Sequence, residues 1–278
     1  MKTKLRMRMV WSAGAVGLAA AILLLGGSAA QAQEKRTIFT EDSFHWQGKL
    51  AAGQTLEVIN TNGDIEASGA ASDGTEANAT KRGHGDDEKD AYIEVVEYPD
   101  GVTICAVYAR NAAPGRCHRG GVNSDSGDFW HHSRAKISFS LNVARGVNLK
   151  AETTNGSVHG RDLKSVVEAS TTNGTIDVAT SEWASGRSTN GHVGIAMGNA
   201  GWSGKLELAT TNGGISVSLP ASAGFKLHAD TTNGSIRTDF PVTVQGTFGT
   251  KNISGTVGDG ARELRLATTN GGIDVKKS

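Results

Sequence analysis

A short motif, Thr-Thr-Asn-Gly followed by one residue and then Ile or Val, constrains the fold of this chain more than any other feature. Full copies begin at Thr153, Thr171, Thr210, Thr231 and Thr268, and shorter copies begin at Thr61 and Thr189. Gly, and to a lesser degree Asn, tolerates a positive φ. We therefore expect a backbone corner at each pair: Asn62 and Gly63, Asn155 and Gly156, Asn173 and Gly174, Asn190 and Gly191, Asn212 and Gly213, Asn233 and Gly234, and Asn270 and Gly271.

The residues on either side of each corner alternate between apolar and polar, as in a half-buried strand. Leu206 and Leu208 precede the Asn212 corner, and Ile215 and Val217 follow it. Apolar residues lie at even offsets before the Asn and at odd offsets after it. Because the strand period is two residues, the corner must shift the phase by one. Each unit is therefore expected to contain two short strands joined by a corner.

The spacing of the corners indicates how the units are arranged. The Asn residues lie at 155, 173, 190, 212 and 233, and a degenerate copy at 252–257 divides the long step to Asn270. A period near 20 residues is typical of solenoid repeats, in which each unit buries its neighbour. We predict an all-β solenoid with coils of about 20 residues. An antiparallel β-meander or sandwich of Asn-Gly hairpins is the alternative.

Residues 1–32 have the order of a secretory signal peptide: a basic start, an apolar run at 10–25, and Ala30-Gln31-Ala32. Cleavage would remove four of the 28 basic residues and no acidic ones, so the formal net charge falls from 0 to −4. That charge argues against a nucleic-acid partner. No later apolar run is long enough to span a membrane. We predict export to the periplasm, or to the cell surface or medium, of a bacterium.

The mature chain, 33–278, is expected to be a single repetitive domain with an irregular insertion at about 70–135. Within that insertion, β-rich runs at 91–98 and 102–108 flank Pro99-Asp100-Gly101, a hairpin turn. Cys105 and Cys117 are the only cysteines. In an exported chain they predict a disulfide that tethers the loop that follows the second run.

The run from Ala144 to Leu149 and the repeats after it resemble an exported bacterial family of unknown function, commonly labelled putative adhesins with β-strand repeats. The likeness is clearest over 136–278. Its motif is structural, so the resemblance implies a β-solenoid or a similar fold and a location in the cell envelope. It implies no catalytic residues.

Candidate chemistry is sparse. Asp177 and Asp274 share one repeat offset but lie coils apart, so they are not expected to form the paired carboxylates of a glycan-active enzyme. The histidines near Cys117, at 118, 131 and 132, fit a solvated loop better than a metal site, so no metal or cofactor is predicted. Trp130, Trp183 and Trp202 are possible ligand-contact aromatics, or they pack on neighbouring turns.

The sequence therefore favours a structural or adhesive binding module of the envelope, without catalytic activity, that presents a β surface to a protein or a glycan. An envelope-sensing or signalling accessory is the main alternative. A polysaccharide-active enzyme on a β-helical scaffold is the less favoured one.

Overall fold

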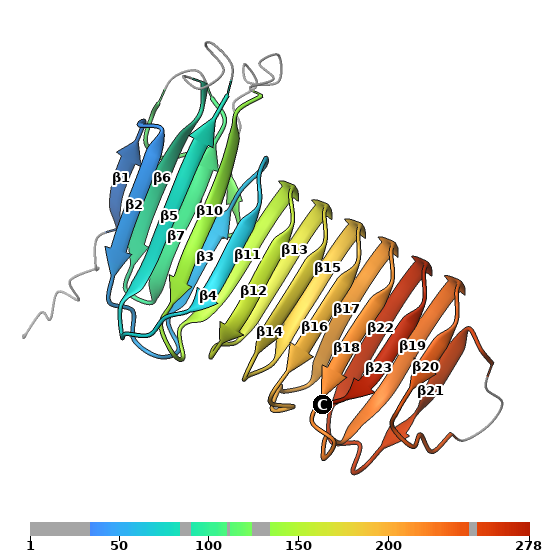
Figure 1. Ribbon diagram of the computed structural model, residues 1–278. Helices are drawn as coiled ribbons and strands as arrows, with labels where there is room; N and C mark the ends of the chain where they lie inside the picture. Colours follow the sequence, from blue (N-terminus) through green and yellow to red (C-terminus); the bar gives the residue numbers. More distant parts are fainter. Residues whose placement is uncertain (1–33, 84–89, 110–111, 124–133, 245–248) are drawn as a thin grey trace, which may run out of the picture. The chain divides into compact units, whose positions relative to one another are not determined.

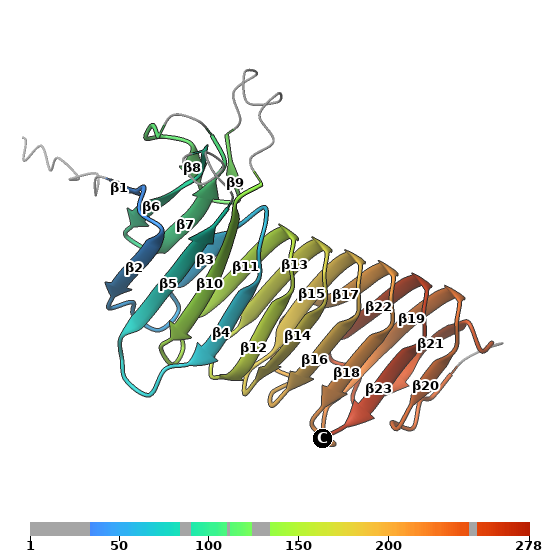
Figure 2. The same ribbon diagram turned by 45° about the horizontal axis from the view of Figure 1, so that its top comes forward.

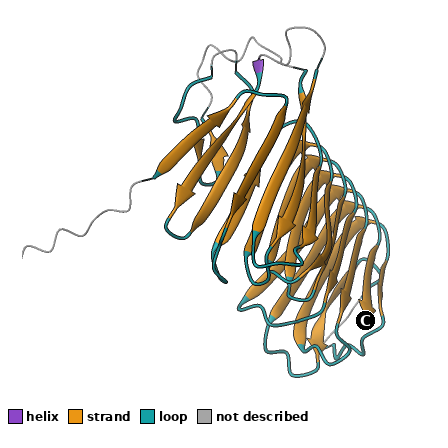
Figure 3. Ribbon diagram, turned by 60° about the vertical axis from the view of Figure 1, so that its left-hand side comes forward, coloured by secondary structure: helices purple, strands orange, loops and turns teal. Residues whose placement is uncertain are grey.

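The computed structural model describes residues 34–83, 90–109, 112–123, 134–244 and 249–278. The predicted signal peptide and Trp130 lie outside these residues. The described residues form the 23 strands β1–β23, arranged in two large sheets and one small one (Figure 1; Figure 3). The described part of the chain contains no helix long and apolar enough to cross a membrane.

The larger sheet, sheet A, has eleven strands. In spatial order they are β1 (Lys35–Phe39), β6 (Tyr92–Tyr98), β7 (Gly101–Val107), β3 (Thr55–Ile59), β11 (Asn148–Asn155), β13 (Val167–Asn173), β15 (Ala184–Asn190), β17 (Lys205–Asn212), β22 (Glu263–Asn270), β19 (Phe225–Asn233) and β21 (Asn252–Val257).

Sheet B has ten strands and faces sheet A across the core. In spatial order they are β2 (Ser43–Gly48), β5 (Thr75–Arg82), β10 (Lys136–Val143), β4 (Ile65–Gly69), β12 (Val158–Leu163), β14 (Ile176–Thr180), β16 (Val193–Met197), β18 (Ile215–Leu219), β23 (Ile273–Lys277) and β20 (Ile236–Thr238). A third sheet pairs β8 (Cys117–His118) with β9 (Gly121–Val122).

Each Asn-Gly corner joins a strand of sheet A to a strand of sheet B, so the two strands of one unit do not pair with each other. Each strand pairs instead with its counterpart in the next unit, in parallel and in register: Leu149 lies opposite Val167, and Asn155 opposite Asn173. This is a solenoid, as predicted, and it excludes the hairpin meander.

The predicted phase shift at the corner is confirmed. In β17 the even offsets Leu206, Leu208 and Thr210 are buried, whereas in β18 the odd offsets Ile215 and Val217 are buried. Stacked coils place these side chains in one continuous core between the sheets. Burial of this much apolar surface is the main favourable contribution to the free energy of folding.

Two hydrogen-bond ladders run along the corners. At five corners, the buried Thr two residues before the Asn donates from Oγ1 to the Gly carbonyl of the neighbouring coil, as Thr210 does to Gly191 O at 2.8 Å. Ser188 does the same at the Asn190 corner. The exposed Asn side chains donate to one another, as Asn212 Nδ2 does to Asn190 Oδ1 at 2.8 Å. The Asn ladder continues through 155, 173, 190, 212, 270 and 233. The repeated motif thus ties each coil to the next.

The predicted positive φ at the corners was wrong, except at Gly63, whose φ is 132°. The other corner glycines are required for close approach. A Cβ at Gly213 would lie 2.0 Å from the carbonyl oxygen of Gly191 in the neighbouring coil. Because each glycine packs against the glycine of the next coil, no side chain fits there.

The coils do not stack in chain order. The coil of β22 and β23 lies between the coil of β17 and β18 and the coil of β19 and β20 (Figure 1; Figure 2). The expected degenerate corner at 252–257 was also wrong. Those residues form β21, which pairs antiparallel with β19 and ends sheet A. Ser254 sits in the middle of that strand, opposite His228, and makes no corner.

The residues expected as an irregular insertion include three strands of the main sheets. β6 and β7 form the predicted hairpin around Pro99-Asp100-Gly101, and β7 pairs parallel with β3. β5 pairs antiparallel with β10, in which buried and more exposed residues alternate. These strands extend both sheets beyond the first Asn-Gly corner.

Candidate functional site

One coil lacks an Asn-Gly corner. β7 in sheet A and β10 in sheet B flank the same core as the other coils, but residues 108–135 connect them. Tyr108 takes the place next to the first corner, where its hydroxyl donates to Asn60 Oδ1 at 3.0 Å. Burial raises the pKa of the Tyr108 hydroxyl, so it stays protonated. The segment 112–123, which we call the outer loop, is the described part of this connection.

The outer loop lies on the outward face of sheet A and covers a second, smaller apolar cluster. That cluster contains Ile59, Tyr92, Val96, Cys105, Val107, Ala109 and Cys117. Cys105 and Cys117 form the predicted disulfide, with their Cα atoms 5.6 Å apart. The bridge joins β7 to the outer loop at a site with no solvent exposure. A disulfide across a loop of this length stabilises by roughly 3 kcal/mol.

A buried carboxylate fixes the same loop. Glu94 of β6 has no solvent exposure and accepts three consecutive backbone N–H groups, from Gly115, Arg116 and Cys117, at 2.7 to 3.1 Å. Arg36 Nη1 donates to the same carboxylate at 3.2 Å. Successive N–H groups of this kind form an anion-binding concavity. Here the chain fills that concavity with its own side chain.

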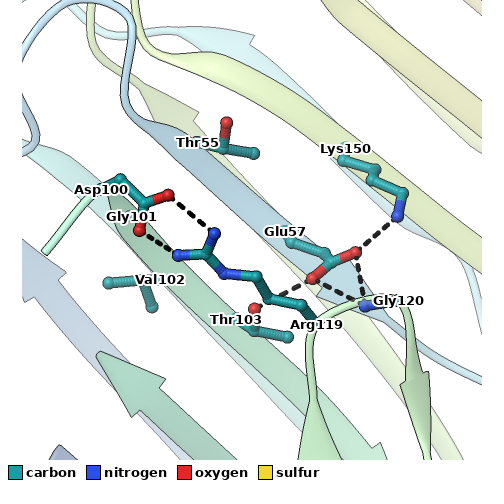
Figure 4. Close-up of a pocket in the computed structure, with 9 residues that line it drawn as sticks. All are labelled: Thr55, Glu57, Asp100, Gly101, Val102, Thr103, Arg119, Gly120 and Lys150. Carbon is teal, nitrogen blue, oxygen red and sulfur yellow. Dashed lines mark hydrogen bonds and ion pairs between the residues drawn. The ribbon is translucent and has the colours of Figure 1, made fainter. Parts of the chain in front are cut away.

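A second carboxylate holds the tip of the loop (Figure 4). Glu57 of β3 is 5% exposed and accepts from Thr103 Oγ1 at 2.9 Å and from Gly120 N at 3.1 Å. Lys150 Nζ of β11 donates to it at 2.7 Å. This hydrogen bond to the Glu57 carboxylate raises the pKa of the Lys150 ammonium.

Arg119 forms the other wall of the same hollow. Its guanidinium makes a two-point ion pair with the Asp100 carboxylate, which raises the pKa of Arg119 and lowers that of Asp100. It also lies 4.3 Å from the centroid of the Tyr98 ring. Contact of this kind between a cation and an aromatic ring is attractive and orients the guanidinium.

Together these groups line a pocket of about 390 Å³, which we call the Glu57 pocket (Figure 4). Its lining residues are Thr55, Glu57, Asp100, Gly101, Val102, Thr103, Arg119, Gly120 and Lys150. The two carboxylates and two cations cancel in charge. The pocket therefore suits a ligand that both donates and accepts hydrogen bonds and carries no strong net charge.

A wider, shallower trough of about 590 Å³ lies further along sheet A. Ala209 of β17 and Ala267 of β22 lie opposite each other, between Arg187 of β15 and Asp230 of β19. The two alanines are adjacent only because the coil of β22 is inserted beside β17. The trough is thus a product of the coil order.

The two described tryptophans that the sequence offered as possible ligand contacts lie in different environments. Trp202 is 2% exposed and its indole N–H donates to Glu263 O at 3.1 Å, so of the two alternatives that the sequence left open it packs within the protein and is not an exposed ligand contact. The ring is buried because it fills the core beneath the turn before β17. Trp183 is partly buried against the main core. Neither tryptophan lines the Glu57 pocket or the trough.

Asp177 and Asp274 face outward on β14 and β23, with β16 and β18 between them. They do not converge. Within the described residues, no group of three or more His, Cys, Asp or Glu side chains is placed to hold a metal ion. The carboxylates of the Glu57 pocket, Glu57 and Asp100, are both held in ion pairs.

Sequence reasoning missed the acids and cations that build the pocket. Glu57 and Glu94 each interrupt an apolar β run, flanked by Leu56 and Val58 and by Ile93 and Val95. A residue that points outward into water would give the same sequence pattern. Only the placement of the outer loop above them turns these positions into buried anchors.

The family model named Toastrack DUF4097 matches residues 51–276 of this chain. No curated protein sequence matches it. Among solved structures, the chain is similar to a "putative cell adhesion protein" from Clostridium sporogenes, with 13% identity and a TM-score of 0.44. That alignment covers 88% of this chain and 100% of the other.

It is also similar to a "putative adhesin" from Bacteroides fragilis, with 10% identity and a TM-score of 0.33, over 84% of this chain and 96% of the other. These likenesses are too distant to support any statement about a ligand or an activity.

Proposed function

This chain belongs to the Toastrack DUF4097 family, and from the surface it presents we propose that it is an exported binding module of the bacterial cell envelope. The outward face of sheet A is its binding face, and the Glu57 pocket is the principal contact. The ligand is an envelope glycan, or a polar segment of an envelope protein. The bound ligand is held without chemical change.

The observation that carries this proposal is the outer loop. Every other coil between β3 and β18 closes with a two-residue corner, so the fold does not require a loop there. The chain nevertheless fastens this loop with a disulfide, the buried Glu94 carboxylate and the buried Glu57 carboxylate. Loops positioned by a rigid scaffold commonly carry binding residues.

The chemistry of the pocket supports a hydroxyl-rich ligand. The side chains of Lys150 and Arg119 are 37% and 49% exposed, although each is already ion-paired. A sugar hydroxyl can donate to a carboxylate oxygen and accept from a cation, so it can join these pairs without breaking them. A ligand of strong net charge would have to disrupt one pair.

The same ion pairs argue against glycan hydrolysis. A glycosidase needs one carboxyl group that can give up a proton and a second one that acts as base or nucleophile. Glu57 accepts four hydrogen bonds, counting both contacts from Gly120 N, and Asp100 is engaged by Arg119. Neither carboxylate is arranged to donate a proton.

A glycan-binding experiment tests the proposal. The mature protein is applied to a panel of immobilised envelope glycans, and bound glycans are tested again with Arg119→Ala. Loss of the Arg119 side chain should weaken glycan binding at least about tenfold, which corresponds to roughly 1.4 kcal/mol of binding free energy. Lys136→Met is the matched control, because Lys136 forms a similar ion pair with Asp64 on sheet B.

An equal loss of glycan affinity in both variants would mean that the glycan does not bind in the Glu57 pocket. Release of shortened glycan during the assay would replace the binding proposal with an enzymatic one.

A further inference from the structure

The coil of β22 and β23, residues 263–277, is inserted between two coils that precede it in the chain. We call it the inserted coil. In sheet A, β22 pairs parallel with β17 on one side and with β19 on the other. In sheet B, β23 pairs parallel with β18 and with β20 (Figure 2). The coils of β17 and β19, which are consecutive in the chain, do not touch through their strands.

The inserted coil is almost a copy of the coil beside it. Residues 206–217 read LELATTNGGISV and residues 264–275 read LRLATTNGGIDV. The two segments differ only where Glu207 is replaced by Arg265 and Ser216 by Asp274. All four of these side chains point outward. The inward residues, the buried Thr and the Asn-Gly corner are the same in both.

Because of this identity, the coil of β19 and β20 has two equivalent partners. It now rests on the inserted coil: Thr231 Oγ1 donates to Gly271 O and Asn233 Nδ2 donates to Asn270 Oδ1, both at 2.8 Å. If the inserted coil left, Gly213 and Asn212 would offer the same acceptors in the same register. Removal of the inserted coil therefore need not leave an open slot.

The connections allow both arrangements. Residues 220–224 link β18 in sheet B to β19 in sheet A and pass the inserted coil. Packed sheets are about 10 Å apart and adjacent strands about 4.8 Å, so a link that crosses between the sheets and moves two strands along spans about 14 Å, within reach of five residues. Direct stacking would need about 11 Å. The inserted coil is reached through Gly258 and Gly260, both of which have positive φ.

Charged side chains on the outward faces of the sheets favour the observed position of the inserted coil. Arg265 lies directly opposite Glu207 of β17, and Asp274 lies directly opposite Arg237 of β20. Opposite charges on directly paired residues are favourable, and like charges are not. A coil that matched β17 completely would place two glutamates side by side. The two substituted positions thus favour insertion at this place.

From these features we propose that the inserted coil is exchanged between copies of this chain. While β19 and β20 are stacked directly on β17 and β18, residues 263–277 have two unpaired strand edges, which readily pair with another chain. The slot that matches them best is the slot between β17 and β19 of a second copy. Reciprocal insertion then links two exported copies, in the manner of domain swapping.

Cysteine cross-linking tests the exchange. One full-length chain carries Glu207→Cys and a second carries Arg265→Cys, and both are exported in the same cells. Directly opposed residues on adjacent strands lie about 5 Å apart, which is within disulfide range. Exchange predicts a covalent heterodimer of twice the chain mass on a non-reducing gel. The double variant in a single chain should form the same bridge, within one chain or between two exchanged copies, and confirms the register.

The matched control is the pair Glu168→Cys and Ser185→Cys, which are directly opposed on β13 and β15. These coils follow chain order and have no reason to exchange, so the two control chains should stay uncoupled when they are exported together. A heterodimer from the first pair alone supports the proposal. Equal coupling in both pairs, or none in the first, overturns it. Failure of the double variant to form any bridge, within a chain or between chains, would also overturn it, because β22 would not lie beside β17.

Discussion

Residues 148–219 and residues 34–123 build the same two sheets by different means. In the first region every strand pairs parallel with its counterpart in the next coil, and each corner repeats the same hydrogen bonds. In the second region antiparallel strands predominate, and a disulfide and two buried carboxylates replace the corner ladder.

The difference separates scaffold from site. The repeated coils contact one another through backbone and identical side chains, so a change in one corner disturbs its neighbours. The outer loop is fastened to the outward face of sheet A by side chains, so it can vary while the core remains intact. A solenoid can thus carry a specialised surface on one coil without disturbing the rest of the stack.

The largest expected effect is at a corner of the repeated region. Gly213→Val would place a Cβ 2.0 Å from the Gly191 carbonyl oxygen, so the coils must separate. We expect a loss of about 3 kcal/mol or more in the free energy of unfolding, measured by urea denaturation. Gly272→Val, which follows the next corner in space at the offset of Gly214, is the control, because its Cβ would lie 3.4 Å from the nearest atom and should cost less. Equal losses in the two variants would contradict close packing at the corner.

Next in size is the buried anchor of the outer loop. Glu94→Gln replaces a carboxylate that accepts three N–H groups, and the amide NH₂ would face one of those donors. We expect a loss of about 2–3 kcal/mol, the range for hydrogen bonds to a charged group. Thermal unfolding measures it. Glu97→Gln on the same strand, half-exposed and paired with Lys35, should change stability by less than about 0.5 kcal/mol.

The ladder of buried threonines should show a smaller effect. Thr210→Val keeps the shape of the side chain but removes the donor to Gly191 O. The expected cost is about 1 kcal/mol, the net value of one hydrogen bond. Thr211→Val, one residue on and exposed, should be close to neutral. If both variants unfolded at the same denaturant concentration, the ladder would contribute nothing to stability.

The smallest effect concerns the ion pair of Asp64. The hydrogen bond from Lys136 holds the pKa of the Asp64 carboxyl below its usual value, with help from the Ser157 N–H. A lowered folded-state pKa stabilises the protein above the unfolded-state pKa, and the gain disappears as pH falls through the folded-state pKa. Lys136→Met should therefore raise the Asp64 pKa in an NMR titration. Its stability deficit at neutral pH should vanish in acid, and an unchanged titration would contradict the pairing.

The repeated region could be predicted closely from the sequence because one local pattern decides it. The alternation around Asn212, with Leu208 before and Ile215 after, already implied two strands and a phase-shifting corner. The pattern could not give the order of the coils. Near-identical repeats fit beside one another in several orders, and the outward residues at which the repeats differ, such as Glu207 and Arg265, look like ordinary surface residues.

The candidate site was much less predictable. The two cysteines indicated the loop and its bridge, but Glu57, Glu94 and Lys150 follow the same alternation as solvated residues. Their roles depend on contacts across 23 to 93 residues of sequence. The burial of Trp202 was hidden for a similar reason, since Glu263 approaches it only through the inserted coil.

Hydrogen–deuterium exchange, with the Cys105–Cys117 bridge intact and then reduced, tests most directly whether the outer loop is a separately fastened addition to a self-supporting stack. Peptides covering 112–123 and β7 should lose protection on reduction, whereas peptides covering 148–219 should exchange at unchanged rates. Loss of protection throughout 148–219, or unchanged protection of the outer loop, would contradict this account.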